Sequence, residues 1–253
     1  MFKLIKYELR ASFLTIIGIC ITVIIANLFL MIKKGSWGIE TIIGLSLCLA
    51  IGALIVIFIS SLKIMSKYLY EDSGYLLFTL PQSGASIMTS RLITAFIQIS
   101  IVTFVAILML YLHSADNIDF SFLKDLKLGV IIYSIISYIY MIASSLTFIY
   151  FCMVIGKVAL KSKKIGKIGS FIIFIIISMI LGWLSSKIMT ILPQTVNISD
   201  FSIKTNYNVL DVALSTSSGV LDINIAQTIL DFIVFVGFFM GTSYLIDRKL
   251  DLS

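Results

Sequence analysis

An uninterrupted apolar run decides the fold: ASFLTIIGICITVIIANLFLMI, residues 11–32, in which no side chain is charged. About 20 apolar residues in a helix are enough to cross the hydrocarbon core of a bilayer. The run is too long for the apolar part of a cleaved signal peptide, no small-residue cleavage site follows it, and Lys33 and Lys34 come next. It is therefore predicted to be a membrane-spanning helix that is not cleaved.

The composition of the chain extends this prediction to the whole protein. Hydrophobic residues make up 59% of the 253 residues and charged residues 13%, whereas about 25% charged residues is usual in globular proteins. The predicted spans are residues 12–32, 41–62, 91–112, 128–155, 168–187 and 225–246. They leave no room for a separate soluble domain of ordinary size. The sequence thus predicts an all-α integral membrane protein with one transmembrane domain over residues 1–253.

The distribution of Lys and Arg orients the predicted spans. If the N-terminus is cytoplasmic, 13 of the 19 Lys and Arg residues fall on the cytoplasmic side, as the positive-inside rule requires. Both termini are therefore expected in the cytoplasm, although Lys33 and Lys34 run against the bias. The rule also accounts for the net charge of +6, so no nucleic-acid partner is predicted.

The first ten residues, MFKLIKYELR, have the pattern of an amphipathic helix. Apolar side chains recur on one face, and Lys3, Lys6 and Arg10 lie side by side next to it. Residues 1–11 are therefore predicted to lie in the headgroup layer, with the cations towards lipid phosphate. A solvated cytoplasmic extension of the first span is the alternative.

Small residues at helical spacing predict close packing between spans. Gly44, Cys48 and Gly52 are four residues apart, and Gly237 and Gly241 form a G-x-x-x-G motif. Small side chains at this spacing let helix backbones approach closely in lipid. No metal site is predicted, because the sequence has one histidine and its three cysteines fall inside spans.

Polar groups inside two spans are candidates for a substrate path. Tyr133, Ser137, Tyr140 and Ser144 form one hydroxyl-bearing stripe down the fourth span. The stripe has a structural alternative, in which the hydroxyls bond backbone carbonyls and neighbouring helices. Asp231 is the one carboxylate within a predicted span, and such acids are functional candidates. It could instead lie near the outer interface.

The connection between the second and third spans is unusually apolar: YLYEDSGYLLFTLPQSGASIMTSR, residues 68–91. The EDSG stretch offers helix-start chemistry, and Pro81 ends the element. An exposed apolar patch at the cytoplasmic surface is typical of a docking site for another protein. Burial of the same leucines in the lipid headgroup region is the alternative.

The sequence contains no motif that would supply energy or catalysis. It has no phosphate-binding G-x-x-x-x-G-K-[ST] loop and no paired intramembrane charges for a proton or sodium cycle. No nucleophile, base and acid are arranged as in an enzyme. The chain is therefore predicted not to be an enzyme and to hold no cofactor of its own, so the predicted docking partner would supply the energy that it lacks.

These features resemble the permease subunit of an ABC-2 type ABC transporter: MFKLIKYELR before the first span, six spans, and YEDSGYLLFTLPQSGASIMTSRLITA between the second and third. In that family the second connection forms a cytoplasmic coupling helix that docks on a separate ATPase. The resemblance implies that residues 68–82 are this coupling segment. The docking residues would be Glu71, Asp72, Gly74, Tyr75, Leu76, Leu77, Phe78, Leu80 and Pro81.

The resemblance also implies partners and a location. Residues 192–224 would form a re-entrant outer gate between the fifth and sixth spans. A separate ABC ATPase would bind ATP and Mg²⁺, and a second permease copy or paralogue would complete a homodimer or heterodimer. The chain would lie in the plasma membrane of a bacterium.

The substrate is predicted from the resemblance to small exporters of amphipathic or antimicrobial peptides, such as those for phenol-soluble-modulin-type toxins or for bacteriocin immunity. Export of a lipid or a small hydrophobic drug is one alternative. A stand-alone secondary transporter or a membrane scaffold is another.

Overall fold

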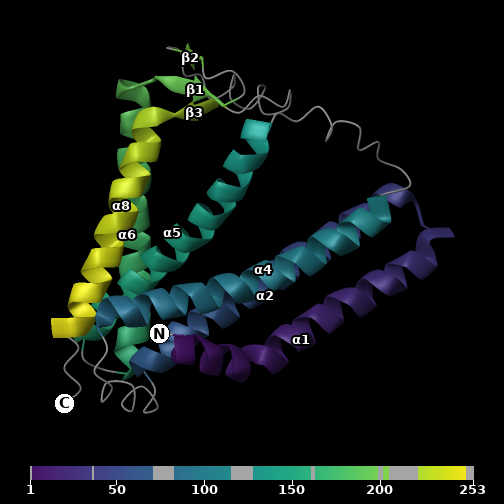
Figure 1. Ribbon diagram of the computed structural model, residues 1–253, viewed down its shortest axis with the longest axis horizontal. Coiled ribbons are helices and arrows are strands. Elements are labelled where there is room, and N and C mark those ends of the chain that lie inside the picture. The colour runs from purple at the N-terminus through teal and green to yellow at the C-terminus, as the bar shows by residue number, and fades with distance from the viewer. Residues whose placement is uncertain are drawn as a thin grey trace. The chain divides into compact units, whose positions relative to one another are not determined.

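The computed structural model describes residues 2–35, 37–70, 83–114, 128–160, 163–198, 202–204 and 222–248. Within these ranges, six helices are long and apolar enough to cross a membrane, as the sequence predicted. They are α1 Phe2–Ile32, α2 Ile39–Tyr70, α4 Gly84–Ser114, α5 Leu128–Leu160, α6 Lys163–Ile191 and α8 Ile225–Arg248 (Figure 1). A short 3₁₀ helix, η1 Lys33–Gly35, follows α1. The protein is therefore an all-α, multi-pass membrane protein.

Several helices continue well beyond the apolar runs that predicted them. The predicted span at residues 41–62 becomes α2, which ends at Tyr70, and α4 begins at Gly84 rather than at Arg91. With 32 residues, α2 is about 48 Å long, against about 30 Å of hydrocarbon. Lys63 and Lys67 thus belong to a helix and not to a loop.

The chain divides into two compact units, residues 1–121 and 122–253. In the first unit, α1, α2 and α4 contact one another. In the second, α5 contacts both α6 and α8, and a small sheet adjoins α8.

Small and flexible side chains build the core between α2 and α4. Buried examples are Ala50, Ala53, Ile57 and Met65 on α2, and Met88, Ala95, Val102 and Ala106 on α4. The packing expected from Gly44 and Gly52 is not seen within this unit, since no atom would contact a Cβ added at either position. Cys48, between them, is exposed. The buried face of α2 is therefore a different one from that predicted.

Aromatic stacking joins the helices of the second unit. The ring of Phe238 on α8 stacks on Phe148 and Phe151 of α5, with centroid distances of 5.3 and 4.6 Å. Gly241 packs closely here, because a Cβ at this position would lie 2.9 Å from the Phe151 ring. One glycine of the G-x-x-x-G motif therefore has the predicted packing role, whereas Gly237 faces open space within the unit.

A three-stranded antiparallel sheet precedes α8 and was not predicted. Its strands are β1 Thr195–Asn197, β2 Ile203–Lys204 and β3 Asp222–Asn224, in the order β2-β1-β3. Thr195 pairs with Lys204 on one side and Asn224 on the other. The described parts of the predicted outer gate are thus short strands next to α6 and α8 (Figure 1); the remainder of residues 192–224 lies outside the described residues.

Asn224 fixes the start of α8. Its side-chain oxygen accepts a hydrogen bond from the Gln227 amide at 2.9 Å, which is the bond of a helix N-cap. Its side-chain nitrogen donates to the Leu192 carbonyl, also at 2.9 Å, just after the end of α6. The Ile225 amide donates to the Gln194 carbonyl at 3.2 Å. These bonds join the two ends of the segment between α6 and α8.

Candidate functional site

The predicted coupling residues, from Glu71 to Pro81, lie outside the described residues, but both of their attachment points are defined. The chain leaves α2 at Tyr70 and enters α4 at Gly84. Ser83 begins α4 as a cap, with its carbonyl accepting from the Ile87 amide at 3.1 Å and its hydroxyl accepting from the Ser86 amide at 3.4 Å. The docking role of the segment stays a prediction.

The predicted interfacial segment is helical and continuous with the first span, since α1 runs from Phe2 to Ile32 without a break. Lys3, Lys6 and Arg10 are exposed, whereas Ile5 is buried. The three cations are thus available to lipid phosphate or to water. The position of this segment in the headgroup layer stays a prediction.

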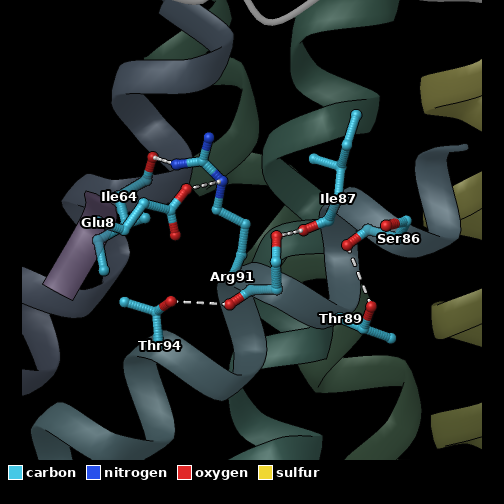
Figure 2. A network of polar contacts seen from close by, with 8 residues as sticks. Glu8, Ile64, Ser86, Ile87, Thr89, Arg91 and Thr94 are labelled. Carbon is cyan, nitrogen blue, oxygen red and sulfur yellow. Dashed lines mark hydrogen bonds and ion pairs between the residues drawn. The ribbon is translucent and has the colours of Figure 1, made fainter. Parts of the chain in front are cut away.

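A buried ion pair that sequence reasoning missed lies next to these two segments. The Arg91 Nε atom on α4 is 3.1 Å from Glu8 Oε1 on α1, and the two side chains are 5% and 12% exposed. Arg91 Nη1 donates to the Ile64 carbonyl on α2 at 2.8 Å. The guanidinium carbon also lies 4.9 Å from the centre of the Tyr68 ring on α2. Figure 2 shows the guanidinium between Glu8 and the Ile64 carbonyl.

This arrangement ties three helices together at one end of the unit. A buried charge is stable only when its partner and its hydrogen bonds are in place, because desolvation of each ion costs several kcal/mol. The planar guanidinium suits the task, since it donates several N–H groups in fixed directions and stacks on an aromatic ring. Arg91 uses these properties to contact α1 and α2 at once.

A second buried polar cluster joins α1, α2 and α4 at a different position along their length. The Ser46 hydroxyl on α2 donates to Asn27 Oδ1 on α1 at 2.6 Å. His113 Nε2 on α4 lies 3.1 Å from the same oxygen, which assigns the proton to that nitrogen. Glu8 and Asn27 are separated by about 28 Å along α1, close to the thickness of the hydrocarbon core.

Within the described residues no group of three or more His, Cys, Asp or Glu could hold a metal ion.

The predicted hydroxyl stripe lies along α5 of the second unit, and its four side chains are half-buried. The Ser144 hydroxyl donates to the Met141 carbonyl of its own helix at 3.2 Å, as the structural alternative described. The ring of Tyr140 packs edge-on against Phe235 of α8, with centroids 5.8 Å apart. Tyr133 and Ser137 lie further towards the start of α5.

Asp231 lies two turns into α8, within a helix that can span the membrane. The Gln227 side-chain amide donates to its Oδ1 at 2.8 Å, and Phe235, which the Tyr140 ring contacts, lies one turn after Asp231 on the same helix. The structure therefore brings together two of the five predicted substrate-path residues, Tyr140 and Asp231, and adds Gln227. The contact between Gln227 and Asp231 could have been predicted from their i to i+4 spacing on one helix.

Comparisons with known proteins found no match: no family model matches the chain, and neither curated proteins nor solved structures gave a significant one. The likeness to ABC-2 permeases stays a prediction from the sequence. Two polar clusters are the candidate functional sites. They are the Glu8–Arg91 cluster of the first unit and the Tyr140–Gln227–Asp231 cluster of the second.

Proposed function

We propose that the chain is the membrane-spanning permease subunit of an ATP-driven ABC exporter in a bacterial plasma membrane. A separate ATPase would bind ATP and Mg²⁺, and a second permease copy or paralogue would form the other half of the transporter. The cargo would be an amphipathic peptide. Six spanning helices and the ABC-2 type sequence features support this proposal.

The observation that carries the proposal is the position of the Glu8–Arg91 cluster. It joins α1 to the two helices that flank residues 71–83, two turns into α4 from Gly84 and close to the last turns of α2. A force applied to the connection would therefore reach α1, α2 and α4 together. A coupling segment needs such an attachment, because a single loosely held helix would bend instead of transmitting motion.

Alternating access is the mechanism that follows. Closure of two ATPase subunits on ATP would move the coupling segments of both permeases, and each would tilt its own three-helix unit as one body. An inward-facing cavity would then open outward, with residues 192–224 at its exit. The N-terminal helix, tied to α4 by Glu8 and Arg91, would follow the same movement along the inner leaflet.

Docking can be tested with charged substitutions in the coupling segment. We expect the double variant Leu77→Glu, Phe78→Glu to lose co-purification of a candidate ABC ATPase that is expressed together with this chain, because its apolar contact surface would carry two charges. A matched control is Leu160→Glu, Ile165→Glu, which places the same charges at the end of α5 and the start of α6. The measurements are stoichiometry after purification through a tag on this chain, and peptide-stimulated ATP hydrolysis in lipid nanodiscs.

Two results would decide against the proposal. A chain that purifies without any bound ATPase would favour the stand-alone transporter or the scaffold. Unchanged co-purification and unchanged hydrolysis in the Leu77→Glu, Phe78→Glu variant would remove the docking role from this segment. Thermal unfolding of the variants checks that the helices remain folded.

A further inference from the structure

The Tyr140–Gln227–Asp231 cluster is rich in hydrogen-bond acceptors that have no partner in the described part of the chain. The Gln227 side chain uses its N–H on Asp231 Oδ1, which leaves its oxygen buried and unpaired. The Tyr140 hydroxyl is also buried and unpaired. Asp231 itself is exposed on the surface of its unit. Two groups with unpaired oxygen atoms, Gln227 and Tyr140, thus lie near one negative charge.

The depth of the cluster makes this arrangement costly unless something pairs with it. Asp231 and Asp247 are 16 residues apart on α8, or about 24 Å, which places Asp231 within about 30 Å of hydrocarbon measured from the cytoplasmic end of the helix. An ionised carboxylate at this depth needs a cation or water. Among the described residues no Lys or Arg lies at ion-pair distance from it.

The surroundings of Asp231 indicate the chemistry of the missing partner. An ammonium group has three N–H donors and no acceptor, which complements a carboxylate, an amide oxygen and a phenol oxygen. The rings of Tyr140 and Phe235, 5.8 Å apart, add aromatic surface that attracts cations and contacts the carbon chain that bears them. A divalent metal fits less well, because Asp231 is the one carboxylate here and such ions take six or more oxygen ligands.

We propose that Tyr140, Gln227 and Asp231 form a binding site for the primary ammonium group of an amphipathic molecule. The assignment of that molecule as a transported peptide rests on the proposed function, whereas the ammonium site itself does not. Asp231 would pair with the charge, Gln227 would orient the carboxylate and accept a second hydrogen bond, and Tyr140 would contribute its oxygen and its ring.

The test is a binding measurement on the chain without any ATPase, in phosphatidylcholine nanodiscs. The probes are a fluorescent amphipathic peptide that carries lysines and the same peptide with each lysine carbamoylated, which removes the charge and adds little bulk. We expect the wild type to prefer the lysine peptide. Asp231→Asn should weaken binding of that peptide about tenfold or more and leave the carbamoylated peptide unaffected, since hydrogen bonds to charged groups are among the strongest.

A matched control and a milder variant sharpen the result. Asp247→Asn makes the same change near the other end of α8 and should retain the preference for lysine. Tyr140→Phe keeps the ring but removes the oxygen, so a loss of about threefold to tenfold is expected. An equal preference for lysine in the wild type and in Asp231→Asn would overturn the proposal. Equal losses in the Asp231 and Asp247 variants would also overturn it, because they would show a general charge effect.

Competition identifies the source of the ammonium group. Dodecylamine should displace the lysine peptide from the wild type, and dodecanol should not. If phosphatidylethanolamine in the nanodisc displaces the peptide equally well, the occupant is a lipid headgroup; if it does not, the occupant is a peptide amine. Failure of dodecylamine to compete would count against an ammonium site. No nucleotide is present, so binding can succeed even if ATP-driven export fails.

Discussion

The two units of the molecule handle a charge within a long apolar helix in opposite ways. In the first unit, Arg91 is 5% exposed, and Glu8, Ile64 and Tyr68 occupy its guanidinium from three directions. In the second, Asp231 is exposed and accepts one hydrogen bond from Gln227 among the described residues. A charge whose partners come from its own unit holds helices together. A charge left open in an apolar helix is available to a ligand, and this contrast makes separate predictions for stability and for binding.

The largest effect on stability is expected from Arg91→Met. The substitution leaves Glu8 buried beside no cation, and breaking a buried pair in this way costs about 3–5 kcal/mol of unfolding free energy. Unfolding in mixed micelles of denaturing and mild detergent would measure the loss. Lys6→Met removes an exposed cation of α1 and is the matched control, with an expected change of about 0.5 kcal/mol or less.

A double variant separates the ion pair from general packing. Glu8→Gln combined with Arg91→Met should lose less stability than the two single variants summed, because neither change then leaves a buried charge without its partner. Additive losses would mean that the two side chains stabilise the unit independently. In that case the cluster would not be the tie between α1 and α4.

A smaller loss is expected from Asn27→Leu, which keeps the side-chain volume but removes the acceptor shared by Ser46 and His113. Leaving buried donors without an acceptor costs about 1–3 kcal/mol. Thr22→Val on the same helix is the control, since the Thr22 hydroxyl is exposed and bonds the Gly18 carbonyl of its own helix. Equal stability of both variants in the same unfolding assay would contradict a tying role for Asn27.

The smallest effect on stability is expected from Asp231→Asn, within about 0.5 kcal/mol of the wild type. The side chain is exposed in its unit, and an asparagine oxygen can still accept the Gln227 hydrogen bond. A loss as large as that of Arg91→Met would remove the contrast between the two units. It would show that Asp231 is paired with another part of the folded protein.

The number and type of the helices could be predicted from the sequence because charge-free runs identify hydrocarbon-spanning segments. The ends of the helices could not be predicted. Hydropathy indicates which residues can lie in the hydrocarbon, and not where backbone hydrogen bonding stops. Lys63 and Lys67 therefore marked the edge of a span, although α2 continues to Tyr70. The strands of the small sheet have two or three residues each and are too short for any periodicity.

The functional clusters were predicted in part for a related reason. Asp231 and Tyr140 could be found because each stands out within its own span. The Glu8–Arg91 pair joins residues far apart in sequence, and in an amphipathic N-terminal helix Glu8 had the pattern of an ordinary surface acid. One signal was available: Arg91 is the one Lys, Arg, Asp or Glu between Gly84 and Ser114, so a partner within the fold was to be expected.

The bonds around Asn224 have an evolutionary consequence. Because Asn224 binds the Leu192 carbonyl and Ile225 binds the Gln194 carbonyl, the segment between the two helices leaves α6 and returns to α8 at one fixed place. The entropy cost of closing a loop rises by only about 0.6 kcal/mol for each doubling of its length. Insertions and deletions between the described strands are therefore inexpensive and leave the register of α8 unchanged. This end of the second unit can diversify while its long helices remain constant.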